Sequence, residues 1–528
     1  MMRFRYIVIL LLFSAMVVEA QPRFVVNIVV SGLRQNDLTR YEENFGKEGF
    51  LRLRNEGVEF SECYANYAPT TSEAGLATLA TGTAPAMHGI FSSVLFDRTT
   101  NKDALLCRKP ISEQSGLVRK EVDESFTTQH FAAQTLSEAV LASSERNRVI
   151  TIAHNPLSAM ILAGRKGECY WLNRNGRWTS ADCYAEELPS WVRSYNKDDM
   201  NRVFATDTWY GRYVKERYRN KVATDITIYE QDNTKRPRSQ RKVSEGWVNN
   251  LLSTPSGNLA LFEFAKRAVG TLLPLHVKDE CKVLNICLDT PRTVAERYGT
   301  DSIEYEDMLY SLDASLAEFL TFLYAQLPSR NDVVVVLTSD SGVSPSKRDN
   351  SDSSRFNTRQ FEVIMNAFLS ARYGQDSWVA SYIDGSLYLN HDVVYRHKKS
   401  LEEVQNEVAN FALQYRGVVM AVTATAMRSA QFSKGAMSLI QSGYNPRRSG
   451  DVMIVLDAER IEQDSERVAM SGSIYNYDRH IPLIVSGAGF APHKVVECVS
   501  NEQIAPTLTS LVGVERPQCC DAEVLKIK

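Results

Sequence analysis

The sequence has little net charge, few histidines and no paired-cysteine motif. Its 60 basic and 63 acidic residues leave a formal charge of −3 at neutral pH, so it lacks the basic surface of a nucleic-acid-binding protein. Only eight histidines are present, and no two are spaced as in HxH, HxxxH or HExxH. The absence of CxxC excludes a zinc ribbon and a thioredoxin-type redox site. We therefore expect no nucleic-acid partner and no histidine-rich metal motif.

Long apolar runs are also absent, except at the N-terminus. After the first twenty residues, no stretch approaches the roughly 18 apolar residues of a membrane-spanning helix. The first twenty combine two arginines with the apolar run Tyr6–Val18 and the small residue Ala20, which is typical of a secretory signal peptide. An uncleaved anchor is the alternative. We predict cleavage near Ala20, a mature chain of residues 21–528 without a transmembrane segment, and a periplasmic or secreted location.

The nine cysteines are odd in number. In an oxidising compartment, at least one must therefore stay free or pair between chains. Cys169 and Cys183 flank a short segment with tryptophan and glycine, and this is the pair that we expect to form a disulfide first. Cys281 and Cys287 are six residues apart on a predicted strand, which puts both on one face but too far apart to bond each other.

Continuous apolar runs predict the strands of the core. A run without polar alternation fits a strand buried on both faces, as in a parallel sheet covered by helices. Between the runs, segments such as Ile303–Leu327 and Leu401–Tyr415 show the spacing of amphipathic helices. This alternation predicts an α/β fold with a doubly wound, mostly parallel central sheet flanked by helices. The predicted strands are Phe24–Val30, Lys282–Leu288, Asp332–Thr338, Asp451–Leu456 and Ile481–Val485.

The middle of the chain has little clean periodicity. Residues 190–280 are richer in arginine, lysine, asparagine and tyrosine, and Asp232–Lys242 is strongly basic. We interpret the basic segment as a solvated loop. The mature chain is therefore predicted to be one domain with an insertion over about residues 165–280.

Several segments then resemble a known family. Residues 66–90 read NYAPTTSEAGLATLATGTAPAMHGI, and residues 473–483 read SIYNYDRHIPL. Both resemble the alkaline phosphatase superfamily, in particular the phosphate-irrepressible periplasmic alkaline phosphatases and the type I phosphodiesterase/nucleotide pyrophosphatases. The resemblance continues in the same order over nearly the whole mature chain. It implies an alkaline-phosphatase-like fold with inserted cap segments and a site for two zinc ions.

The positions that correspond to the family's catalytic groups are altered. The nucleophile position falls on Ser72, whose hydroxyl is chemically adequate. Ser93 stands where the family has an asparagine that contacts phosphate. Asn155 and Leu157 replace the Lys-x-Arg pair that clamps it, and neither offers a cation.

The positions that correspond to metal ligands are altered more strongly. By resemblance, only Asp340 keeps a ligand type, because zinc binds nitrogen and carboxylate oxygen. Asp289 offers an alternative carboxylate one register away from Arg292. The replaced positions are Ser31, Arg292, Glu296, Ser341 and Ser471. We therefore expect a degenerate zinc site and no cofactor.

Two functions remain open. The first is a catalytically inactive pseudophosphatase that acts by binding or scaffolding an unknown protein or ligand partner. The alternative is an active phosphomonoesterase or phosphodiesterase with an altered metal site and Ser72 as nucleophile. A weaker third possibility is an exported structural protein without a ligand. In each case, we expect the strand ends to bring one set of residues into a single cleft: Ser31, Ser72, Asp340, Ser341 and Ser471.

Overall fold

A computed structural model describes residues 22–110, 121–205, 208–220, 227–229, 238–242, 246–273, 280–346, 355–462 and 467–527. The predicted signal peptide and most of the basic segment Asp232–Lys242 lie outside these ranges. Among the described residues, no helix has both the length and the apolar character needed to cross a membrane.

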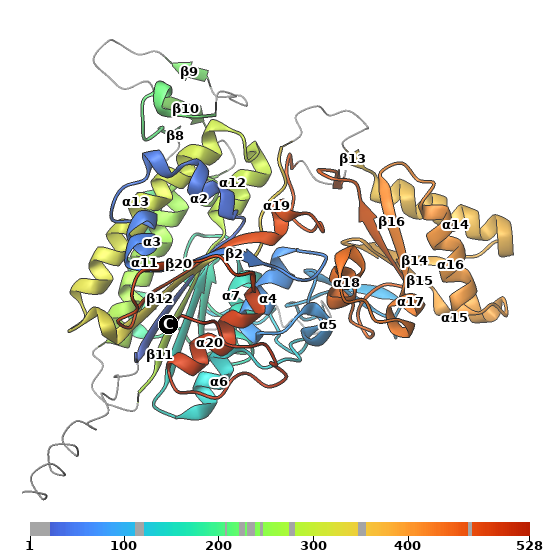
Figure 1. Cartoon of the computed structure of the whole chain (residues 1–528), viewed down its shortest axis with the longest axis horizontal. Helices are drawn as coiled ribbons and strands as arrows, with labels where there is room; N and C mark the ends of the chain where they lie inside the picture. The colour runs from blue at the N-terminus through green and yellow to red at the C-terminus, as the bar shows by residue number, and fades with distance from the viewer. Residues whose placement is uncertain are drawn as a thin grey trace, which may run out of the picture.

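A ten-stranded sheet forms the centre of the molecule (Figure 1). Five neighbouring strands, from β12 to β6, run parallel, while β19 is antiparallel to both of its neighbours. This confirms the predicted α/β fold. In hydrogen-bonded order the strands are β20 (His493–Val495), β2 (Gly57–Tyr64), β19 (His480–Gly487), β12 (Val333–Thr338), β1 (Phe24–Val30), β11 (Lys282–Leu288), β5 (Arg148–Ala153), β6 (Glu168–Leu172) and β7 (Trp178–Thr179), with β21 (Val499–Ser500) paired to β2.

Helices cover both faces of this sheet, which explains its uninterrupted apolar strands. Along β1, Phe24, Val26 and Ile28 pack into one core, while Val25 and Val29 pack into the core on the opposite face. The first core is covered by α2 (Gln35–Arg40), α3 (Phe50–Glu56), α11 (Ser256–Leu272), α12 (Thr290–Tyr298) and α13 (Ile303–Ala325). The second is covered by α4 (Ser72–Thr81), α6 (Leu136–Ser143), α7 (Pro156–Ala163) and α20 (Ile504–Leu511).

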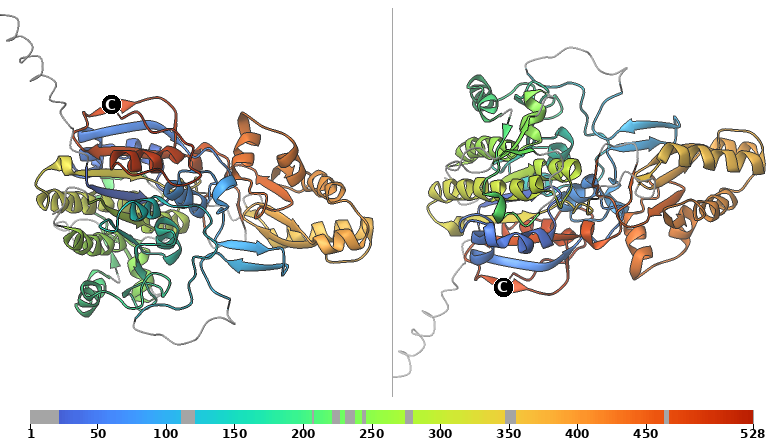
Figure 2. Two further views of the ribbon diagram at one scale, coloured as in Figure 1. Left: turned by 90° about the horizontal axis from the view of Figure 1, so that it is seen from below. Right: turned by 90° about the horizontal axis from the view of Figure 1, so that it is seen from above.

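A second, antiparallel unit projects from one end of the molecule (Figure 2). Its sheet has the order β14 (Val379–Ile383), β15 (Ser386–Leu389), β17 (Val452–Leu456) and β16 (Val418–Thr423). Helices α14 (Thr358–Tyr373) and α16 (Leu401–Ala412) pack on one face of it. We call this the cap unit.

The cap unit corrects one sequence prediction. The run Asp451–Leu456 was expected in the central sheet, but β17 lies in the cap sheet. Its side chains alternate between two cores, Val452 and Ile454 in one and Met453 and Val455 in the other. The strand is therefore buried on both faces, and its sequence has the same pattern as a central parallel strand.

Residues 165–280 contribute both to the central body and to a peripheral sheet. β6 and β7 extend the central sheet, and α11 packs on it. Within the described residues, β8 (Thr208–Trp209), β9 (Thr227–Tyr229) and β10 (Arg238–Lys242) form a separate three-stranded sheet.

The predicted Cys169–Cys183 disulfide is not formed in this structure. Both residues are free thiols, and Cys183 is exposed. Cys169 lies within β6 and points into the buried core of one sheet face. Burial and, after it, the neighbouring Cys183 raise the pKa of the Cys169 thiol, so the two thiols lie near each other without a bond.

Candidate functional site

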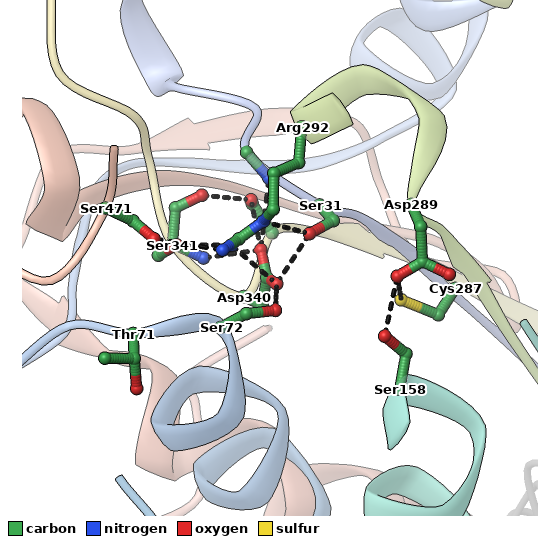
Figure 3. Close-up of polar contacts among 12 residues, drawn as sticks. Ser31, Thr71, Ser72, Ser158, Cys287, Asp289, Arg292, Asp340, Ser341 and Ser471 are labelled. Atoms are coloured by element: carbon green, nitrogen blue, oxygen red, sulfur yellow. Dashed lines mark hydrogen bonds and ion pairs between the residues drawn. The ribbon is translucent and has the colours of Figure 1, made fainter. Parts of the chain in front are cut away.

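The carboxyl ends of three adjacent parallel strands form the site. Ser31 follows β1, Asp340 and Ser341 follow β12, and α12 follows β11 and carries Arg292. Such strand ends are the usual ligand-binding edge of an α/β sheet. Figure 3 shows Arg292 pointing into the group formed by these residues.

Helix α4 adds the candidate nucleophile. Thr71 caps this helix, because its hydroxyl accepts a hydrogen bond from the Ala74 backbone N–H at 3.2 Å. Ser72, the first residue of α4, therefore lies at the helix N-terminus. Its hydroxyl donates to the Asp340 carboxylate. A Cβ at Gly75 would lie 1.9 Å from the Asp340 carbonyl oxygen, so only glycine lets α4 approach β12 this closely.

Asp340 is fully buried and its carboxylate accepts hydrogen bonds at both oxygens. Oδ2 accepts from the Ser31 hydroxyl at 2.7 Å, from Ser72, and from the Arg292 Nη2 at 2.9 Å. Oδ1 accepts from the backbone N–H groups of Gly32 at 3.1 Å and Ser341 at 2.7 Å. Together with the Ser339 hydroxyl, which donates to Oδ1 at 3.4 Å, six donors thus hold this carboxylate in a fixed orientation.

Arg292 hydrogen-bonds to the other side chains gathered at these strand ends, but not to Ser72. Its Nε donates to the Ser31 hydroxyl at 2.8 Å, and its Nη1 donates to the Ser471 hydroxyl at 2.9 Å. Its Nη2 donates to Ser341 Oγ at 2.8 Å as well as to Asp340. The side chain is only 14% exposed. Burial is the largest single influence and lowers the pKa of its guanidinium, but the carboxylates of Asp340, Glu296, Glu73 and Asp289 together raise that pKa by more, so the group stays charged.

The convergence predicted from the sequence is therefore observed. The structure joins Ser31, Ser72, Asp340, Ser341 and Ser471 in one hydrogen-bonded cluster, with Arg292 at its centre. We call these six residues the arginine cluster.

Glu296 and Asp289 lie outside the arginine cluster. Glu296 forms an ion pair with Arg467 at 3.3 Å. Asp289 accepts hydrogen bonds from the backbone N–H groups of His154 at 3.1 Å and Asn155 at 2.9 Å. In Figure 3 its carboxylate points toward Ser158, whose hydroxyl donates to it at 2.6 Å. The carboxylate of Asp289, the alternative ligand, is therefore bound to the chain segment around Asn155 and not to the arginine cluster.

The other predicted phosphate-contact residues line one pocket with Ser72. This pocket has a volume of about 290 Å³, and Ser93, Asn155 and Leu157 are part of its wall. The Asn155 side chain caps α7, accepting from the Leu157 backbone N–H at 2.9 Å. That hydrogen bond fixes the Asn155 amide within its own chain segment.

Carboxylates outnumber cations around this pocket. Its wall contains two arginines, Arg292 and Arg467, and four acidic residues: Glu73, Asp289, Glu296 and Asp384. Burial raises the pKa of Glu73 to about 7, and the neighbouring Asp384 adds to this shift. The pocket thus disfavours a further anion.

Sequence reasoning missed Glu73 and Asp384. Asp384 comes from the cap unit, where Asp384 and Gly385 form the two-residue turn between β14 and β15, with φ of 41° and 77°. Asp-Gly is a strong sequence signal for such a hairpin turn. It predicts the turn, but it does not indicate that the turn reaches the pocket.

The raised pKa of Glu73 leads to a prediction about pH. Between the ordinary pKa of 4.5 and about 7, the folded state binds more protons than the unfolded state. Stability is therefore lost as the pH rises through this range. Glu73→Gln removes that loss, so we expect the variant to exceed the wild type in free energy of unfolding at pH 8 by about 1–3 kcal/mol, with no difference at pH 4.

Urea unfolding at the two pH values measures this difference. The matched control is Glu407→Gln, which removes a carboxylate paired with Arg372 on the cap helices. Since surface pairs contribute about 0–1 kcal/mol, the control should change stability little at either pH. A Glu73→Gln variant that is less stable than the wild type at pH 8 would contradict the assignment.

The arginine cluster does not have the donor set of a zinc site. Zinc is usually held by four cysteine, histidine or carboxylate ligands, whereas this cluster offers one carboxylate, serine hydroxyls and a guanidinium. Among the described residues, no group of three or more histidine, cysteine, aspartate or glutamate side chains is placed to hold a metal ion. His88 and His154 are buried against Thr78 and the Gly257 carbonyl, at 3.1 and 2.8 Å.

Comparison with known proteins agrees with this architecture. The sequence model of the family described as type I phosphodiesterase / nucleotide pyrophosphatase matches residues 25–462. The chain is 26% identical over 514 residues to a protein named calcium-transporting ATPase from Myroides odoratus, covering 94% of this chain and 93% of that protein. It is 23% identical over 508 residues to alkaline phosphatase PafA of Elizabethkingia meningoseptica, covering 94% and 92%.

Solved structures show the same fold. The crystal structure of wild-type alkaline phosphatase PafA superposes with a TM-score of 0.85 at 22% identity, covering 96% of this chain and 98% of that one. A murine ectonucleotide pyrophosphatase / phosphodiesterase 5 superposes with a TM-score of 0.51 at 14% identity. The second match covers 93% of this chain and 95% of that one.

Proposed function

Because this chain belongs to the type I phosphodiesterase / nucleotide pyrophosphatase family, we propose that it is an exported member that has lost two-metal phosphatase chemistry and acts by binding. The family's curated relatives include proteins named alkaline phosphatases. The proposed protein therefore has the fold of a hydrolase but acts by binding.

The observation that carries the proposal is the position of Arg292. Its guanidinium lies at the strand ends where the resemblance places the metal ions, and it hydrogen-bonds to three serines and Asp340. A divalent cation at that place would meet a buried positive charge at short range, where low dielectric strengthens repulsion. The guanidinium already supplies the positive charge that pairs with Asp340. Unlike a catalytic zinc ion, it has no open coordination position for water or substrate.

The surroundings of Ser72 also argue against catalysis. A serine nucleophile needs a base that removes its proton. The Asp340 carboxylate is already engaged by Ser31, Arg292 and two backbone N–H groups. Both oxygens of Asp340 are thus already occupied by donors other than Ser72. Among the described residues, no histidine hydrogen-bonds to Ser72, whose hydroxyl donates to Asp340 instead.

The pocket offers little to a phosphate group. Asn155 and Leu157 supply no cation, and Glu73 and Asp384 add negative charge beside Ser72. A transferring phosphoryl group requires positive charge at its oxygens. We therefore propose that the partner is a protein or a ligand other than a phosphate ester, met after export through the predicted signal peptide.

One experiment tests this function. The mature protein is purified, its zinc content is measured by elemental analysis, and hydrolysis of an aryl phosphomonoester and an aryl phosphodiester is followed from neutral to alkaline pH. We expect substoichiometric zinc and no turnover above that of Ser72→Ala. Stoichiometric zinc with turnover lost in Ser72→Ala would establish the altered-site phosphatase instead. Equal turnover in both proteins would come from a contaminant and leave the proposal standing.

A further inference from the structure

Three thiols gather where the second core of the central sheet meets the surface. Cys107 and Cys169 are buried members of this core, which α4 and α7 cover, while Cys183 is exposed. Cys183 lies between Ala181, which is buried in the same core, and Tyr184, which packs against it. We call Cys107, Cys169 and Cys183 the thiol cluster.

An ion pair joins the chain segments that carry Cys107 and Cys183. The Lys109 ammonium pairs with the Asp182 carboxylate at 2.8 Å, and each partner lies within two residues of one of these cysteines. Burial raises the pKa of the Cys107 thiol, and Cys183 contributes more to this rise than Glu73 does. Since charges shift one another's ionisation strongly only at short range, the two sulfur atoms are close.

Both of these cysteines lie in turns, where the backbone can adjust to the geometry of a disulfide. Such a bond requires Cα atoms about 4.4–6.8 Å apart. Cys107 follows β4 (Lys102–Leu105), and Cys183 lies in the turn after β7. Cys169 is instead held inside β6 by pairing with β5, and the Tyr184 hydroxyl hydrogen-bonds to its thiol. Cys107 is therefore the better partner for Cys183.

We propose that Cys107 and Cys183 form a reversible disulfide, which makes the thiol cluster a redox-sensitive site. The exposed Cys183 reacts first with an oxidant, and the buried Cys107 then completes the bond. The exposed sulfur also leaves the disulfide open to reducing thiols. This site is independent of the proposed loss of phosphatase activity, because it uses neither Ser72 nor a metal ion.

The oxidant is a small-molecule disulfide, and the exchange takes place in two steps. The Cys183 thiolate attacks glutathione disulfide, which forms a mixed disulfide at Cys183 and releases one glutathione thiolate. The Cys107 thiolate then attacks the Cys183 sulfur and releases the second glutathione thiolate. Two protein thiols are thus oxidised, one glutathione disulfide is reduced, and the two protons lost by the protein are taken up by the two glutathione thiolates.

The local charges decide the conditions of the test. Partial burial raises the pKa of the Cys183 thiol to about 11, and the Asp182 carboxylate adds to this rise while Lys109 opposes it. The thiolate is the attacking species in the first step. Exchange should therefore be slow at neutral pH, and the test is carried out at pH 8.5.

Disulfide mapping in the wild-type protein tests the proposal without depending on the folding of a variant. The reduced mature protein is incubated with glutathione disulfide, freed of excess reagent, alkylated, and digested without reductant for mass spectrometry. We expect one peptide pair joined through Cys107 and Cys183, which disappears after treatment with dithiothreitol. A persistent glutathione adduct on Cys183, a bond from Cys183 to Cys169, or free thiols at both positions would overturn the proposal.

The bond should also stabilise the protein, because it closes a long loop of the unfolded chain. We expect the oxidised wild type to melt about 5 °C or more above the reduced protein. Cys107→Ser should abolish this gain and leave Cys183 as a glutathione adduct. The matched control is Cys498→Ser, which removes an exposed cysteine next to β21 and should keep the gain. Equal gains in the two variants would overturn the proposal.

Discussion

Replacing Arg292 by leucine is expected to lower the free energy of unfolding by about 3–5 kcal/mol, because it leaves a buried carboxylate without its cation. Asp340 is fully buried, and Arg292 is the cation that pairs with it at 2.9 Å. The substitution also removes the donors to Ser31, Ser341 and Ser471. Urea unfolding at neutral pH measures the loss.

Two further variants show whether charge and geometry are responsible. Arg292→Lys keeps the positive charge but loses the planar fork that contacts four residues at once, so its loss should be intermediate. Arg467→Leu removes another arginine of the same pocket, whose side chain is 52% exposed beside Glu296. We expect this control to change stability by less than about 1 kcal/mol. An Arg292→Leu variant as stable as the control would contradict the role of the ion pair.

Gly75→Ala is expected to lower the free energy of unfolding by about 3 kcal/mol or more, since overpacking against rigid backbone forces elements apart. The added methyl group would lie 1.9 Å from the Asp340 carbonyl oxygen. Helix α4 must then move away from β12, and Ser72 must move away from Asp340. Thermal unfolding measures the loss of stability, and a crystal structure of the variant shows the displacement.

The same substitution elsewhere should have the opposite sign. Gly270 lies in α11, is exposed, and nothing lies within 4 Å of a Cβ built on it. Alanine there should stabilise the protein by about 0.5–1 kcal/mol, because it lowers the entropy of the unfolded chain. If Gly75→Ala and Gly270→Ala were equally stable, the close approach of α4 to β12 would be refuted.

The central sheet was predictable because two-sided burial leaves a clear signal. The strands at Phe24–Val30 and Val333–Thr338 are apolar at nearly every position, and both lie in that sheet. The same signal misplaced Val452–Leu456, because a strand enclosed by two cores of the cap unit has the same composition. An apolar run shows that both faces are covered, but it does not show which sheet the strand joins.

The site was predictable only in part, for a related reason. Motif resemblance identified Ser72 and Asp340 because both lie in conspicuous strand-end or helix-start segments. The inward direction of Arg292 depends on where α12 packs, which is a tertiary property. Asp384 belongs to a turn of the cap unit, more than 300 residues from Ser72 in the chain. Its place in the pocket follows from the docking of the two units and from no local pattern.

The hydrogen bonds of Arg292 also limit which single substitutions could turn the arginine cluster into a metal site. Ser31 and Ser341 are fully buried, so an imidazole or a longer carboxylate introduced there first would overpack the cluster. Removing the guanidinium first would instead expose Asp340 to the penalty of an unpaired buried charge. Single substitutions at Ser31, Ser341 or Arg292 toward a metal centre thus each begin with a less stable protein. A metal centre at these strand ends would therefore need several substitutions together.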